Sequence, residues 1–258
     1  MHDTKKLQYR ICELASKSGE GHVPSALSIL DIVWVIYDKF MNLNNIKNQN
    51  LNREHFILSK GHASLAQYVV LEKKGIIKKN KLDTYLSYNS DFGGHPDSNK
   101  VKGVEASTGS LGHGMPIAAG ISYAKILLKI KSRVFCIVGD GECNEGTIWE
   151  TCLIASNHNL NNLVCIIDKN KSTDRAIKID DIKKKFLSFN WNVVTIDGHN
   201  QKNLIKVLKK KTSKPLAIIA KTIKGKGVKF MELNQHEWHH KKIDDTVLKK
   251  IKTKIFKK

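Results

Sequence analysis

Arginine, proline and long apolar runs are scarce in this sequence, and each scarcity excludes a class of protein. Only four of the 44 basic residues are arginine: Arg10, Arg53, Arg133 and Arg175. The formal net charge of +20 therefore comes from lysines scattered along the chain, without the pattern of a specific nucleic-acid-binding surface. With four prolines and 41% apolar residues, the composition favours a compact domain over a disordered or fibrous chain.

Membrane signals and paired cysteines are also lacking. No apolar run reaches the roughly 18 residues of a membrane span, and none follows the amino terminus as the core of a signal peptide would. The five cysteines form no Cys-x-x-Cys pair, and four of them fall in or beside apolar runs. This usage is typical of reduced, buried thiols. We therefore expect a cytoplasmic protein that binds neither a membrane nor a specific nucleic acid.

The apolar pattern predicts one α/β domain over residues 1–258, with a mostly parallel central sheet flanked by helices on both faces. Strands are expected at 56–58, 134–138, 163–167, 193–196 and 216–220. Helices are expected at 4–18, 25–41, 63–74, 116–130, 147–159 and 202–211, with Ser25 as the cap of the second. Residues 44–54 indicate a surface loop, and 244–256 a basic amphipathic helix docked on the domain.

The stretch 134–172 is the centre of this pattern, because it reads as strand, turn, helix and strand. Asp140 follows the first of these strands and Asn170 follows the second. The carboxyl ends of parallel strands meet at one sheet edge, so we expect the two side chains to be neighbours. With Gly141 allowing close backbone approach, they suit a hard cation that carries a diphosphate. The alternative is an ordinary turn with Asp as a helix cap, and Gly-Asp-Gly alone favours it.

Histidines near glycines form a second group of candidates. His22 and His62 each lie in a glycine-containing turn before a predicted helix, so each is a candidate active-site group or merely a capping residue. The segment Lys224-Gly225-Lys226-Gly227 suits a phosphate, or is a solvated basic loop.

A family resemblance favours the chemical interpretation. Gly139-Asp140-Gly141, closed by Asn170, resembles the thiamine-diphosphate motif, and further motifs follow the order found in transketolases. These are Gly21-His22, Ser59-Lys60-Gly61-His62-Ala63, Gly93-Gly94-His95-Pro96, Thr108-Gly109-Ser110-Leu111-Gly112, Lys224-Gly225-Lys226-Gly227 and Trp238-His239. The sequence departs from the family at His113, where Gln is usual, and at His240, which replaces a glycine.

The resemblance implies a role for each matching residue. Asp140, Asn170 and the Ser172 carbonyl would hold Mg²⁺. The thiamine diphosphate would lie against His62, Gly109, Ser110, Leu111, Gly139 and Gly141, with Glu145 at the subunit interface. His22, His95 and His239 would act on the substrate.

The resemblance covers only the amino-terminal half of a full-length transketolase. The family's activating glutamate and most of its sugar-phosphate arginines belong to the following domain. This implies a separate carboxy-terminal subunit that supplies the pyrimidine-binding domain, in an α2β2-like assembly. The expected activity is transfer of a two-carbon ketol unit from a ketose or ketose phosphate to an aldose. The alternatives are another donor or acceptor, as in deoxyxylulose-phosphate synthesis or specialised sugar biosynthesis, and a non-catalytic assembly protein that retains the fold.

Overall fold

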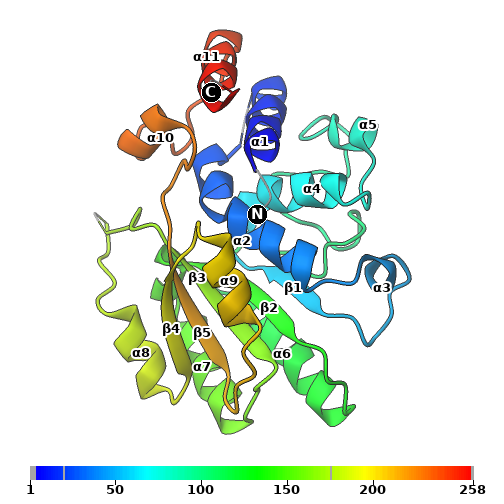
Figure 1. Ribbon diagram of the computed structural model, residues 1–258, viewed down its shortest axis with the longest axis vertical. Helices are drawn as coiled ribbons and strands as arrows, with labels where there is room; N and C mark the ends of the chain where they lie inside the picture. Colours follow the sequence, from blue (N-terminus) through cyan, green and yellow to red (C-terminus); the bar gives the residue numbers. More distant parts are fainter. Residues whose placement is uncertain (1–3, 20, 175, 257–258) are drawn as a thin grey trace.

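Five parallel strands form the central sheet of the computed structural model, which describes residues 4–19, 21–174 and 176–256 (Figure 1). Residues 1–3 and 257–258, at the ends of the predicted domain, and also Glu20 and Arg175 lie outside that description. The strands are β1 (His55–Leu58), β2 (Val134–Gly139), β3 (Leu163–Lys169), β4 (Asn192–Asp197) and β5 (Leu216–Lys221). Their order across the sheet is β1-β2-β3-β5-β4, and every neighbouring pair is parallel.

Successive residues of the inner strands are buried on opposite faces of the sheet, which explains why these strands are apolar runs without polar alternation. In β2, Phe135 and Ile137 join the hydrophobic core on one face, while Cys136 and Val138 join the core on the other. Each face is therefore covered by helices (Figure 1).

The core on the first face includes α2 (Val23–Lys39), α4 (Ser64–Lys73) and α9 (Gln201–Leu208), with α1 (Lys5–Ser18) packed on α2 and α4. On the second face lie α6 (Gly114–Leu127), α7 (Gly146–Asn157) and α8 (Ile182–Ser188). The last helix, α11 (Asp245–Phe256), packs against α1, with Ile251 and Ile255 buried. The predicted α/β class, with its parallel sheet between helical layers, is confirmed. In the part of the chain that the structure describes, no helix has the length and apolarity needed to cross a membrane.

Short elements depart from the sequence prediction. Helix α2 begins at Val23, with Pro24 in its first turn, so the predicted cap Ser25 lies inside the helix and the prediction was wrong. The expected loop at 44–54 contains part of α3 (Leu43–Lys47), where the Asn42 side chain accepts hydrogen bonds from two backbone N–H groups. Two further short helices, α5 (Lys79–Leu82) and α10 (Lys229–Leu233), also lie in segments with no helical prediction.

Candidate active site

A cavity of about 340 Å³ opens beyond the carboxyl ends of β1, β2, β3 and β5. Its volume lies within the range of small-molecule sites. Ten of the sequence-predicted site residues line it: His22, His62, Gly109, Leu111, Gly139, Asp140, Gly141, Asn170, Ser172 and His239. The fold thus gathers residues from both ends of the chain around one cavity.

Three of the predicted site residues are not in the cavity lining. His95 is exposed, but its ring lies directly against Gly109, since a Cβ added at that glycine would come within 3.2 Å of the ring. Ser110 is exposed, and Glu145 is exposed at the start of α7. His95 therefore lies beside a lining residue, while Ser110 and Glu145 face solvent in this chain.

Asp140 and Asn170 hold the two central turns together. The backbone N–H of Lys171 donates to Asp140 Oδ2 at 2.6 Å, and that of Gly141 donates to Oδ1 at 2.9 Å. Asn170 Oδ1 in turn accepts from the N–H of Ser172 at 3.0 Å. Burial, and then the nearby Asp168 charge, raise the pKa of Asp140. A cation at this place would offset both effects by stabilising the carboxylate.

The loop at Gly141 is too tightly packed for a larger residue. A Cβ there would come within 2.4 Å of the Thr173 side chain. Thr173 lines the cavity, and its Oγ1 is buried without a hydrogen-bond partner among the residues that the structure describes. An unsatisfied buried hydroxyl beside a carboxylate and a carboxamide fits a ligand with polar groups. This oxygen-rich donor set suits Mg²⁺ and a diphosphate.

Sequence reasoning assigned no role to Asp168, which organises the floor of the site. Its carboxylate is fully buried and accepts from Lys60 Nζ at 2.5 Å, Ser28 Oγ at 2.7 Å and Asn170 Nδ2 at 2.9 Å, and also from the Thr222 hydroxyl. Burial opposes ionisation most strongly, but the Lys60 charge and the hydrogen bonds from Lys60, Thr222 and Ser28 together outweigh it and keep the pKa of Asp168 below its usual range. By accepting from Nδ2, Asp168 turns the Asn170 oxygen toward Ser172. The sequence does contain a signal for this role, because Asp168 is an acidic residue at the end of a strand that is buried on both faces.

Glu142 is a second buried carboxylate that the sequence did not single out. It accepts from the backbone N–H of Gly112 at 2.9 Å and of Gly139 at 3.0 Å, and from the Ser59 hydroxyl. Burial raises the pKa of Glu142. Glu142 thereby connects three loops: the loop after β1, the loop before α6 and the loop after β2.

Lys224 is buried in the cavity wall, so the description of 224–227 as a solvated basic loop is wrong for this residue. Its Nζ lies 2.9 Å from Nδ1 of His239. Burial, and then the charge of Lys60, lower the pKa of Lys224 to about 8. The lysine side chain therefore lies against a histidine that lines the same cavity.

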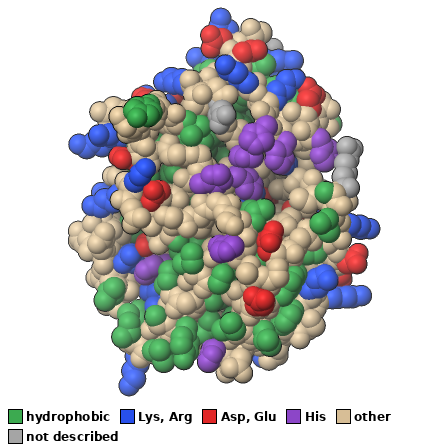
Figure 2. All heavy atoms as spheres, turned by 180° about the vertical axis from the view of Figure 1, so that it is seen from behind, with side chains coloured by type: hydrophobic (Ala, Val, Ile, Leu, Met, Phe, Trp, Pro, Cys, Tyr) green, Lys and Arg blue, Asp and Glu red, His purple; other side chains and the backbone are tan. Residues whose placement is uncertain are grey.

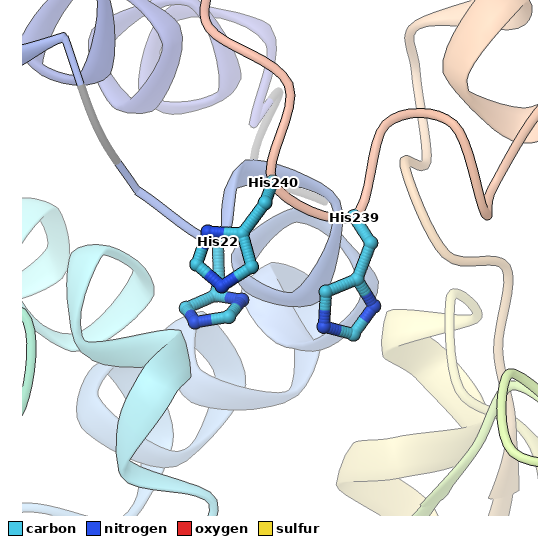
Figure 3. A group of neighbouring side chains, drawn as sticks. All are labelled: His22, His239 and His240. Carbon is cyan, nitrogen blue, oxygen red and sulfur yellow. The ribbon is translucent and has the colours of Figure 1, made fainter.

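Histidines gather on the face seen in Figure 2, and His22, His62 and His239 line the cavity. Figure 3 shows His22, His239 and His240 side by side. The His22 ring centre lies 5.0 Å from that of His62, 5.4 Å from His239 and 4.0 Å from His240. Burial lowers the pKa of His22 to about 4, with His240 adding to the effect, and burial lowers that of His62 to about 2. His22 is the N-cap residue of α2 through its backbone carbonyl, but neither its side chain nor that of His62 makes a capping hydrogen bond.

The family model described as "Transketolase, thiamine diphosphate binding domain" matches residues 7–256. The chain belongs to the transketolase family. The resemblance inferred from the motifs is thus confirmed, together with the thiamine-diphosphate-binding domain and the assignment to transketolase-type transferases.

Relatives differ in how much of their length this family member covers. It is 33% identical to a Phocaeicola vulgatus protein named as one subunit of an apulose-4-phosphate transketolase, over 92% of this chain and 86% of that protein. It is also 33% identical to the transketolase of Homo sapiens, over 97% of this chain but 41% of that protein. The crystal structure of transketolase from Campylobacter jejuni superposes with a TM-score of 0.90 at 30% identity, covering 99% of this chain and 43% of that one. The chain thus spans less than half of these full-length transketolases and most of the relative that is named as one subunit.

Proposed function

We propose that this protein is the amino-terminal subunit of a two-subunit transketolase, which moves a two-carbon ketol unit from a ketose or ketose phosphate to an aldose. The observation that carries the proposal is the shared cavity of Asp140, Asn170 and the histidines in a member of this family. The Phocaeicola vulgatus relative, by its name one subunit of an apulose-4-phosphate transketolase, supports both the split organisation and a sugar-phosphate substrate.

The proposed metal ligands are Asp140, Asn170 and the backbone carbonyl of Ser172, all of which line the cavity. Carboxylate, amide and carbonyl oxygens are the donors that Mg²⁺ prefers, and the ion would hold the diphosphate. We assign His62, Gly139 and Gly141 to the diphosphate side. Gly109 and Leu111 would face the cofactor rings, with Ser110 beside them and Glu145 toward the partner subunit.

When bound, thiamine diphosphate supplies the nucleophile and the electron sink for carbon–carbon bond cleavage. The protein must orient the sugar and move its protons. His22 and His239, which line the cavity, would do so, because a neutral imidazole both accepts and donates hydrogen bonds. Lys224 orients the His239 ring, and His95, packed on Gly109, would contact the hydroxyketone end of the substrate.

An exposed apolar surface on α6 and α7 supports a partner subunit. The exposed side chains on these helices and directly after α6 are Ile117, Tyr123, Ile126, Leu127, Leu128, Leu153 and Ile154. Hydrophobic side chains gather in the lower half of the face seen in Figure 2. Apolar patches of this kind mark interaction sites. We propose that a carboxy-terminal subunit covers this surface in an α2β2 assembly, and that it supplies the activating carboxylate and the sugar-phosphate arginines.

We also propose that residues 1–258 act as one domain in the cytoplasm. All five cysteines are buried and unpaired, which fits a reducing compartment.

Calorimetric titration of thiamine diphosphate tests the cofactor site. The chain should bind weakly alone, and more tightly when Mg²⁺ and the partner subunit are both present. If no combination binds the cofactor, the proposal fails and a non-catalytic assembly protein becomes the better description.

A turnover assay of the reconstituted pair tests the reaction. Ketose phosphates should serve as donors and pyruvate should not. Turnover with pyruvate would instead assign the deoxyxylulose-phosphate-synthase-like alternative.

A further inference from the structure

Three histidines at the cavity mouth lie close enough to share one metal ion (Figure 3). His22 stands at the start of α2, whereas His239 and His240 lie on the segment between α10 and α11. One ring nitrogen from each lies within 4.8 Å of the others. The fold thus joins side chains that are more than two hundred positions apart in sequence.

We propose that His22, His239 and His240 form a binding site for a borderline divalent cation, of which Zn²⁺ is the model. Zinc–nitrogen bonds of about 2.0–2.1 Å place tetrahedral ligands within about 3.5 Å of one another, so small side-chain rotations close the site. Three imidazoles also leave a fourth position open for water or a substrate oxygen. The site is chemically distinct from the oxygen donors Asp140 and Asn170, which suit the harder Mg²⁺.

One buried ring nitrogen of the three histidines lacks a partner among the described residues, and two of the three histidines are exposed to solvent. His22 Nδ1 is buried and has no hydrogen-bond partner in the described ranges 4–19, 21–174 and 176–256. A buried nitrogen of this kind gains a partner when it binds a metal. His240 is exposed, so an ion reaches the site directly from solvent.

Nearby charges permit a cation but weaken its binding. Lys60 is neutralised by its ion pair with Asp168. Lys224 is closer, at 2.9 Å from His239 Nδ1. A metal that uses this nitrogen displaces the ammonium group, and a metal that uses Nε2 displaces a proton. We therefore expect reversible binding and not the permanent occupancy of a structural zinc site.

Bound metal would close the substrate entrance, because it would sit between His22 and His239 above the cavity. This consequence rests on the proposed function, since it matters only if sugars enter there. Metal binding itself does not depend on turnover.

Titration of the purified full chain with ZnCl2 tests the site, with no cofactor and no partner present. Calorimetry should show saturable binding of one Zn²⁺ per chain. His240→Ala should weaken it by about 100-fold or more, since even loss of an outer-shell group costs about 10- to 100-fold in affinity. The control His236→Ala removes an exposed histidine of the same segment and should bind as the wild type does. Asp140→Ala should also retain Zn²⁺, which separates this site from the magnesium site.

Absence of saturable binding would overturn the proposal. Equal Zn²⁺ affinity in the wild type and His240→Ala would also overturn it, as would equal losses of affinity in His240→Ala and His236→Ala. In the reconstituted enzyme, Zn²⁺ should inhibit the wild type, and His240→Ala should need about 100-fold more metal for the same inhibition. If the enzyme shows no turnover, the proposed function fails while the calorimetric result still stands.

Discussion

At the scale of single residues, the site depends on charges held away from water. Asp140 and Asp168 are both nearly or fully buried, and their pKa values shift in opposite directions. At Asp140 burial prevails, whereas at Asp168 the ion pair with Lys60 and the hydrogen bonds from hydroxyl groups outweigh burial. Asp140 is thus the carboxylate that a bound cation would stabilise most. The same burial keeps His22 and His62 neutral at ordinary pH.

Replacing Asp140 by alanine tests the metal site. We expect Asp140→Ala to weaken thiamine-diphosphate binding in the presence of Mg²⁺ by about 100-fold or more, because it removes a charged oxygen ligand. Calorimetry measures the affinity, and circular dichroism should show an unchanged fold. The exposed-site control Asp180→Ala should bind normally. Unchanged affinity in Asp140→Ala would exclude this residue from the metal site.

His95 is predicted to act on the substrate and not on the cofactor. In the reconstituted enzyme, His95→Ala should lower kcat by about 100-fold, the effect of losing an acid–base or hydrogen-bonding group. Its cofactor affinity should stay close to that of the wild type. Steady-state kinetics and calorimetry together separate the two effects. Wild-type turnover in the variant would rule out the substrate role.

His62 makes stability depend on pH. Its folded pKa of about 2 lies below the ordinary value of 6.5, so between these values the unfolded chain binds a proton that the folded protein does not. The contribution of His62 to stability is therefore fully present when the pH is above the ordinary histidine pKa, and it is lost as the pH is lowered. When the pH falls from about 7 to about 5, the free energy of unfolding should drop in both proteins. We expect the drop to be smaller in His62→Gln than in the wild type, by roughly 1–2 kcal/mol. Urea denaturation at several pH values measures this, and parallel pH curves would contradict it.

At the scale of elements, the loops after β1, β2, β3 and β5 converge because buried polar side chains join them. Lys60 follows β1, Asp168 ends the apolar part of β3, and Thr222 follows β5. The register places Asp168 beside Gly139 of β2 and Ala220 of β5, so its backbone belongs to the sheet while its carboxylate reaches the site. One carboxylate therefore fixes three strand ends.

Removing Lys60 should destabilise the fold through this network. We expect Lys60→Met to cost about 3–5 kcal/mol of unfolding free energy, because it leaves the Asp168 charge buried without its cation. Lys241→Met removes an exposed ion pair with Glu237 and should cost no more than about 1 kcal/mol. Urea denaturation compares the two variants. Equal, small losses would show that the buried pair does not stabilise the fold.

At the scale of the whole molecule, the two helical layers differ in what they leave exposed. The α1, α2 and α4 side carries a closed core, whereas α6 and α7 present apolar side chains to solvent. The cavity adjoins this second layer through Gly109 and Leu111, which precede α6. A partner on α6 and α7 would therefore reach the mouth of the site.

Leu153→Glu tests this interface. Leu153 on α7 is 61% exposed, so the charge should change stability by no more than about 0.5 kcal/mol while abolishing association with the partner subunit. The control Leu51→Glu alters a leucine that is 69% exposed outside this surface, and it should still associate. Sedimentation velocity of each variant mixed with the partner measures the complex. Normal assembly of Leu153→Glu would remove α7 from the interface.

Much of the fold and the centre of the site could be predicted from local patterns. The inner strands of the sheet were located because both their faces are buried, and Asp140 and Asn170 were expected together because they follow parallel strands. Short helices such as α3 and α5 were missed, because four or five residues are too few to show a helical period. Ser25 was misassigned because Pro24 already fits the first helical turn.

The sequence by itself determined the α/β class, the family motifs and the oxygen donors of the central turns. Only the tertiary structure decided that Lys60 pairs with Asp168, that Lys224 contacts His239, and that His22 meets His239 and His240. The physical reason is that periodicity reports which face of an element is buried, whereas contacts between distant side chains depend on strand order and loop path. Here β5 lies between β3 and β4, and that order brings Lys224 to the same edge of the sheet as Asp168.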